Sequence, residues 1–164
     1  MSKMTKITPF LWFDTQAEEA ATFYTSVFER SRIIEVARYG DAGPGTAGSV
    51  MTVSFELDGQ RFVALNGGPE NFRFNESVSF VVNCTTQAEV DHFWARLSDG
   101  GQEGACGWLK DKYGLSWQIV PDRLLELVTG PDPETSQRAM KAMFEMKKID
   151  IAALERSIAD PARS

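Results

Sequence analysis

The sequence predicts an α+β fold in which a unit of one strand, one helix and three strands precedes a shortened second unit and C-terminal helices. Short apolar runs between turn residues indicate the strands, and apolar residues at helical spacing indicate the helices. The first strand–helix pattern also returns 70 residues later. The 164 residues have the length of one domain, which we place at 1–164. Within it we expect a first unit at 5–68, a second at 76–122 and C-terminal helices at 131–160.

The first unit begins with a strand over 7–13, and Asp14 is placed to cap a helix over 17–28. Three more strands are expected at 31–39, 50–57 and 61–66. Asp58-Gly59 lies between the last two strands and favours a two-residue hairpin turn.

The second unit opens in the same way, because the 70-residue shift places Phe10 on Phe80 and Tyr24 on Trp94. Few residues separate its helix from its last strand, so we expect a reduced set of two strands and a short piece. The expected elements are a strand at 77–83, a helix at 87–97, the short piece at 102–105 and two strands within 106–121, which turn at 112–114.

The remaining chain is expected to be helical. A helix over 134–147 carries a stripe of Met140, Met143 and Phe144, which is typical of core or dimer packing. Asp150 is placed to cap a last short helix.

Several segments resemble one protein family. The most specific is the run from Cys106 to Pro121, CGWLKDKYGLSWQIVP, and the others are PFLWFD at 9–14, AEEA at 17–20, FY at 23–24 and MKKIDI at 146–151. By these residues the chain is similar to the PhnB-like group, often labelled 3-demethylubiquinone methyltransferase-like. The group belongs to the vicinal oxygen chelate superfamily, with glyoxalase I and the bleomycin-resistance proteins. The resemblance implies the glyoxalase-like fold of tandem βαβββ modules, here with a truncated second module.

The resemblance also provides a test for a metal site. Members of the superfamily usually hold a divalent metal ion with His, Gln or Glu side chains on four strands. These positions fall on Ile7, Ser77, Gln118 and either Ala64 or Asn66. Because the four residues offer no carboxylate and no imidazole, we expect no metal ion. The sequence indicates no other cofactor.

Other catalytic arrangements find little support. His92 is the only histidine, and its position in the middle of a helix is typical of a surface residue. The glycine-rich stretch at 41–49 joins two expected strands, whereas a phosphate-binding loop leads into a helix. A methyltransferase that uses S-adenosylmethionine would need a glycine-rich strand-to-helix turn and a later acidic residue, and the sequence contains neither.

Strand alternation predicts a concave pocket of mixed polarity on the face that carries the metal positions. The candidate ligand-binding residues are Gln118, Ser77, Asn66, Ser116, Leu11, Phe13 and Ile7, and Pro9, Ser79, Val81, Asn83 and Val120 complete the expected lining. The opposite face, with Thr8, Phe10, Trp12, Phe80, Trp117 and Ile119, is expected to pack under the helices. Gln118 and Asn66 have the alternative of bonding only to neighbouring strand backbone. Since no Lys, Arg or His falls in this lining, the expected ligand is neutral or weakly cationic and partly aromatic.

Two classes of function remain open. One is a metal-free module that binds a small molecule, like the resistance proteins that sequester their compounds. The other is a metal-independent or substrate-assisted enzyme of the lyase, isomerase or transferase type, in which Gln118 and Asn66 bond a carbonyl or enolate oxygen. The lack of a convincing acid–base pair favours the binding module.

Composition restricts the partners and the location. A net charge of −6 with scattered basic residues argues against nucleic acid. No apolar run approaches the roughly 20 residues of a membrane span, and the N-terminus leads into a strand, so we expect a bacterial cytoplasmic protein. Cys84 and Cys106 fit no metal spacing and are expected to be reduced thiols. A homodimer is expected, because the truncated second unit leaves strand edges that a second copy can complete.

Overall fold

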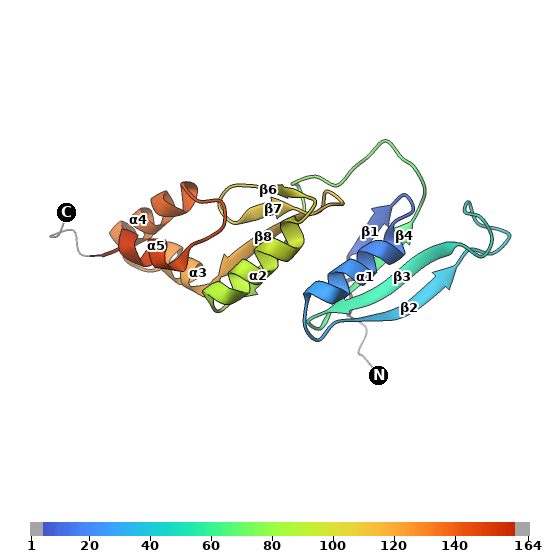
Figure 1. Ribbon diagram of the computed structural model, residues 1–164, viewed down its shortest axis with the longest axis horizontal. Helices are drawn as coiled ribbons and strands as arrows, with labels where there is room; N and C mark the ends of the chain where they lie inside the picture. Colours follow the sequence, from blue (N-terminus) through green and yellow to red (C-terminus); the bar gives the residue numbers. More distant parts are fainter. Residues whose placement is uncertain (1–4, 160–164) are drawn as a thin grey trace. The chain divides into compact units, whose positions relative to one another are not determined.

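The computed structural model describes residues 5–159 and divides into two compact units, with the boundary between Phe72 and Arg73. Each unit contains one four-stranded sheet and a helix that lies along it (Figure 1). The predicted α+β class is confirmed.

The first unit has the strand order β1-β4-β3-β2, with β1 parallel to β4 and the other neighbours antiparallel. Its elements are β1 (Phe10–Phe13), α1 (Ala17–Val27), β2 (Arg32–Arg38), β3 (Val50–Leu57) and β4 (Gln60–Asn66). The predicted order of elements is confirmed. The predicted hairpin turn lies at Asp58 and Gly59, whose φ angles of 47° and 86° are what a type I′ turn requires.

The second unit repeats this topology in the order β5-β8-β7-β6, with β5 parallel to β8. Its elements are β5 (Ser79–Cys84), α2 (Gln87–Ser98), β6 (Gln102–Glu103), β7 (Trp108–Lys110), β8 (Ser116–Pro121), α3 (Asp122–Val128), α4 (Pro133–Phe144) and α5 (Ile151–Ser157). The tandem of βαβββ modules is therefore present. The second sheet keeps all four strands but is shortened, because β6 has two residues and β7 three. Helix α3 was not predicted, since β8 runs into it without a separating loop.

Each sheet buries apolar side chains on the face that its helix covers. In the first unit Tyr24 of α1 stacks on Phe55, with ring centroids 6.1 Å apart. The buried strand residues on this face are Leu11, Phe13, Val53, Phe55, Leu57, Phe62 and Ala64. In the second unit they are Val82, Cys84, Leu109, Trp117 and Ile119, with Val90, Trp94 and Leu97 buried on α2. We call the opposite face of each sheet its open face.

The predicted faces of β1 were wrong. Leu11 and Phe13 are buried, whereas Phe10 is 59% exposed and Trp12 is 38% exposed. In the second unit the prediction was right, because Trp117 and Ile119 are buried under α2. The pocket wall expected from β1 therefore lies in the helix-covered core.

A difference of one residue explains the error. Leu11 and Phe13 correspond to Val82 and Cys84, 71 residues later, whereas α1 and α2 begin 70 residues apart. The 70-residue repeat thus aligns the helices but slips the strands by one position. Because successive side chains point to opposite faces, a slip of one residue exchanges the two faces of a strand.

The helix caps also differ from expectation. Asp14 does not cap α1, whose N-cap residue is Gln16 with no side-chain capping bond. In α2 the hydroxyl of Thr86 accepts from the backbone N of Glu89 at 3.2 Å. The predicted cap of the last helix is confirmed, because Asp150 Oδ1 accepts from the backbone N of Ala153 at 3.1 Å.

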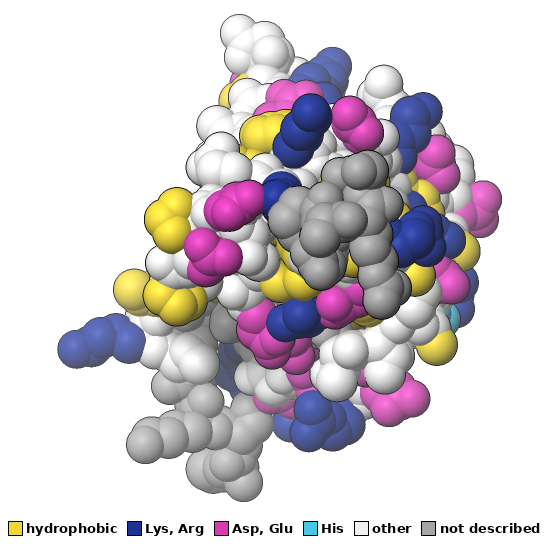
Figure 2. Space-filling model, turned by 90° about the vertical axis from the view of Figure 1, so that its left-hand side faces the viewer, with side chains coloured by type: hydrophobic (Ala, Val, Ile, Leu, Met, Phe, Trp, Pro, Cys, Tyr) yellow, Lys and Arg dark blue, Asp and Glu magenta, His cyan; other side chains and the backbone are white. Residues whose placement is uncertain are grey.

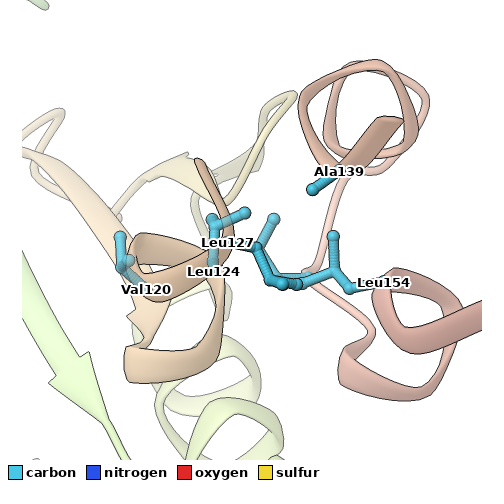
Figure 3. Close-up of a cluster of buried hydrophobic side chains, with 6 residues drawn as sticks. Val120, Leu124, Leu127, Ala139 and Leu154 are labelled. Atoms are coloured by element: carbon cyan, nitrogen blue, oxygen red, sulfur yellow. The ribbon is translucent and has the colours of Figure 1, made fainter. Parts of the chain in front are cut away.

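The C-terminal helices enclose a core of their own at the end of β8. Figure 3 shows Leu124 and Leu127 of α3 on one side of this cluster, and Ala139 of α4 and Leu154 of α5 on the other side. Met143 packs against this cluster, whereas the side chain of Phe144 is exposed. Gln87 of α2 fastens the chain before α5, since its side chain donates to the carbonyl of Ile149 at 3.0 Å and accepts from the backbone N of Ile151 at 2.9 Å.

The surface over these helices carries charges of both signs, and Lys and Arg side chains lie among Asp and Glu side chains (Figure 2). Arg123 of α3 bonds Glu155 of α5, and Lys148 bonds Asp91 of α2 at 2.8 Å. Between residues 5 and 159, none of the helices has the length and apolar composition needed to cross a membrane.

Candidate functional site

The open face of the second sheet carries the predicted polar residues of β8. Trp117 and Ile119 are buried under α2, so Ser116 and Gln118 lie on the opposite face. Ser79 of β5 is directly across from Ser116 in the strand register. The Nε2 of Gln118 donates to the hydroxyl of Ser79 at 2.9 Å. The structure therefore brings Gln118, Ser116 and Ser79 together.

Ser116 is the most unusual member of this group. Its side chain is 1% exposed, and its Oγ has no hydrogen-bond partner among residues 5–159. A buried hydroxyl without a partner costs about 1–3 kcal/mol of stability, so such groups are rare in folded proteins. The capacity of this hydroxyl to donate and accept hydrogen bonds is therefore unused among the described residues.

A tight turn between β7 and β8 sets the position of these residues. Asp111 is 2% exposed, and its Oδ1 accepts from the backbone N of Tyr113 at 2.8 Å and of Leu115 at 3.1 Å. Its Oδ2 accepts from the indole Nε1 of Trp117 at 2.9 Å. The buried carboxylate thus holds the turn together and fixes the register of β8, including the side chain of Gln118.

Lys110 lies on the same open face, which the sequence did not predict. Lys110 is directly across from Ser116 in the antiparallel register of β7 and β8. Its ammonium group forms an ion pair with Glu76, in the turn before β5, and this contact lowers the pKa of the Glu76 carboxyl below its ordinary value. The expectation of a lining without cations was wrong, because β7 places Lys110 beside the polar group.

Asn66 has a structural role in the first unit. Its Oδ1 accepts from the backbone N of Ala17 at 2.8 Å, and its Nδ2 donates to the carbonyl of Val50 at 3.2 Å. The side chain therefore supplies the cap that α1 lacks from its own sequence. This is close to the alternative in which Asn66 bonds only backbone, and a ligand contact of Asn66 stays a prediction.

Four other predicted site residues do not lie on the open face of their sheet. Ile7 is exposed and precedes β1, and Ser77 is exposed in the turn before β5, where its hydroxyl bonds Asn75. Leu11 and Phe13 are buried under α1. Of these four residues, none lies on an open face.

The glycine-rich stretch joins β2 to β3, as predicted. It folds over the ring of Tyr39, and side chains at Gly43 or Gly45 would overlap that ring. The Tyr39 hydroxyl donates to the carbonyl of Asn66 at 2.6 Å. The glycines thus allow the loop to pack closely against Tyr39.

His92 is exposed on α2, with its ring 5.0 Å from that of Phe93.

A family model described as 3-demethylubiquinone-9 3-methyltransferase matches residues 5–120. The chain belongs to this family, the PhnB-like group. A PhnB protein from Bacillus cereus has a similar structure, with 39% identity, a TM-score of 0.66, and coverage of 71% of this chain and 99% of that one. Protein PA1353 from Pseudomonas aeruginosa has 19% identity and a TM-score of 0.59, covering 73% and 100% of the two chains.

A fosfomycin resistance protein, FosX, from Mesorhizobium loti is also similar, with 14% identity and a TM-score of 0.48 over 71% and 92% of the two chains. A search of curated proteins found no match. The resemblance to the PhnB-like group is confirmed. The family match ends within β8, so helices α3 to α5 lie beyond it.

The residues of this PhnB-like protein do not fit the metal site that its superfamily implies. Within residues 5–159 there is no group of three or more His, Cys, Asp or Glu side chains placed to hold a metal ion. On the open faces, the register pairs Gln118 with Val81, and Phe10 with Val63. The side chains placed around Gln118 also include two serine hydroxyls and the ammonium group of Lys110, and together they are a poor donor set for a divalent transition metal.

Proposed function

We propose that this PhnB-like protein is a metal-free module that binds a small molecule on the open face of its second sheet. The observation that supports the proposal most is the buried hydroxyl of Ser116, which has no partner among the described residues. A ligand oxygen or nitrogen that bonds this hydroxyl would recover part of the cost of burying it. The Gln118–Ser79 pair adds donors and acceptors beside it.

The proposal predicts opposite effects of one substitution on stability and on binding. Ser116→Ala removes a hydroxyl that is unsatisfied in the free protein, so it should raise the free energy of unfolding by about 1 kcal/mol. The same change should weaken ligand binding. If Ser116→Ala instead destabilises the free protein, the hydroxyl serves the fold and the proposal loses its main support.

The experiment uses purified protein incubated with a bacterial metabolite extract, and bound compounds are identified by mass spectrometry. Wild type should retain a small molecule that Gln118→Ala loses, with nearly unchanged unfolding. Gln137→Ala is the matched control, because Gln137 is exposed on α4. Equal retention by the wild type and Gln118→Ala, with a lower melting temperature for the variant, would mean that Gln118 is only a structural amide.

Elemental analysis of the same sample tests the metal-free part of the proposal. About one Mn, Fe, Ni or Zn per chain that survives dialysis would contradict it.

We also propose that the protein functions in the cytoplasm, where both free cysteines, Cys84 and Cys106, would stay reduced.

We also propose that the protein acts as a homodimer. The open faces expose large apolar side chains, namely Phe10 and Trp12 in the first unit and Val81 in the second. Covering them with a second copy would remove apolar surface from water. Light scattering should give twice the mass of one chain at micromolar concentration, and the mass of a single chain would contradict the dimer.

A further inference from the structure

Lys110 has an unusual position for a charged residue of a sheet. Its register neighbour is the unpartnered Ser116, which carries no charge. At the corresponding place in the first sheet, Glu56 of β3 lies across from Arg61 of β4, so opposite charges face each other within the strands. Lys110 instead obtains its counter-charge from Glu76, which lies outside the sheet.

The two partners of this ion pair differ in exposure. The Lys110 side chain is 34% exposed, whereas that of Glu76 is 61% exposed. Glu76 can therefore turn into solvent while Lys110 remains beside Ser116. Exposed ion pairs contribute little to stability, so little is lost when they separate.

We propose that the open face of the second sheet binds a small molecule through its carboxylate group, and that the carboxylate displaces Glu76 from Lys110. This inference rests on the proposed function and names the chemical class of its ligand. In the free protein, the Glu76 carboxylate pairs with Lys110 in the way that the ligand carboxylate does in the complex.

Three donors serve the ligand carboxylate. The Lys110 ammonium gives a charge-assisted hydrogen bond, which is stronger than a neutral one. The Ser116 hydroxyl gives a second bond and gains the partner that it lacks in the free protein. The Gln118 amide has two N–H donors and uses one for Ser79. A neutral ligand would leave Lys110 paired with Glu76 and would gain nothing from the cation.

The test is a titration of ¹⁵N-labelled full-length protein with sodium benzoate and with benzamide, its neutral counterpart, at constant ionic strength. NMR shift changes report both affinity and location. Benzoate should bind more tightly than benzamide and should shift the backbone signals of Ser79, Lys110 and Ser116.

Variants separate the contributions. Glu76→Gln removes the internal competitor and should tighten benzoate binding about two- to fivefold. Lys110→Gln should weaken it about tenfold or more, and Ser116→Ala about threefold. Asp91→Asn is the matched control, because it removes one negative charge from another Lys–carboxylate pair of the same unit, the pair between Asp91 of α2 and Lys148. It should leave both affinities unchanged.

The outcomes distinguish this inference from the proposed function. If benzamide binds as tightly as benzoate at Gln118 and Glu76→Gln has no effect, carboxylate recognition is wrong and the binding module stands. If Asp91→Asn tightens benzoate binding as much as Glu76→Gln does, the effect is one of net charge and the inference fails. If neither probe shifts any signal of the open face, both proposals are contradicted.

Discussion

The two βαβββ units share one topology but present different chemistry on their open faces. In the first unit, β1 exposes Phe10 and Trp12, whereas in the second, β5 and β8 present Ser79 and Gln118. Trp12 is held in place by a bond from its Nε1 to the carbonyl of Gly68 at 3.0 Å. A repeated fold thus keeps apolar side chains on the helix-covered face, where packing restricts them, and allows the open face to diverge.

Helix capping shows how the units diverge. Thr86, next to α2, caps that helix itself. The connection before α1 is one residue longer, and its N-cap residue makes no side-chain capping bond, so Asn66 supplies the cap from the end of β4. One inserted residue thus replaces a local interaction by one from the neighbouring strand, β4.

The hairpin turns show the same contrast. In the first unit, Asp58 and Gly59 adopt the φ angles of a type I′ turn through the backbone alone. In the second unit, the turn depends on a side chain, because the buried carboxylate of Asp111 accepts hydrogen bonds from two backbone N–H groups and one indole N–H.

The largest effect is expected from Asp111→Asn. The change places an amide NH₂ against the Trp117 N–H or the turn N–H groups, and leaves buried donors unsatisfied. We expect a loss of about 3 kcal/mol or more in the free energy of unfolding, measured by urea denaturation. Asp58→Asn is the control, because Asp58 is exposed and Asn also fits its turn, so the expected change is within about 0.5 kcal/mol. Equal effects of the two changes would remove the distinction between the turns.

A smaller effect is expected from Asn66→Ala. It removes the acceptor of Ala17 N and the donor to Val50 O, so we expect a loss of about 2 kcal/mol. Thr86→Ala removes only one capping bond and should cost about 1 kcal/mol. Thermal unfolding compares the two. Unchanged stability with lost ligand binding in Asn66→Ala would assign this residue to the site.

The smallest effect concerns Cys84, whose counterpart in β1, Phe13, does not titrate. Burial raises the pKa of the Cys84 thiol from 9.0 to about 12. Between these values the unfolded chain releases a proton that the folded chain keeps, so stability falls as the pH rises above 9. At pH 10 the wild type should have lost about 1 kcal/mol relative to pH 8 that Cys84→Ala does not lose, as followed by urea denaturation. Parallel pH profiles of the two proteins would contradict the assignment.

Local sequence patterns were enough to predict much of this fold. Apolar periodicity and turn residues predicted the strand–helix order of both units, and alternation placed Trp117 and Ile119 under α2 and Gln118 on the opposite face. These features depend on residues that are close together in the sequence, so the spacing of apolar residues predicts them.

Three features depend on tertiary packing, namely the faces of β1, the cap from Asn66 and the pairing of Lys110 with Glu76. A strand of four residues with apolar side chains on both faces has no alternation to read, so only the packing of α1 showed that Leu11 and Phe13 are inside. Asn66 and Ala17 are 49 residues apart in the chain, and Lys110 and Glu76 belong to different segments of the second unit. Such contacts arise from strand register and helix packing, which local sequence patterns do not specify.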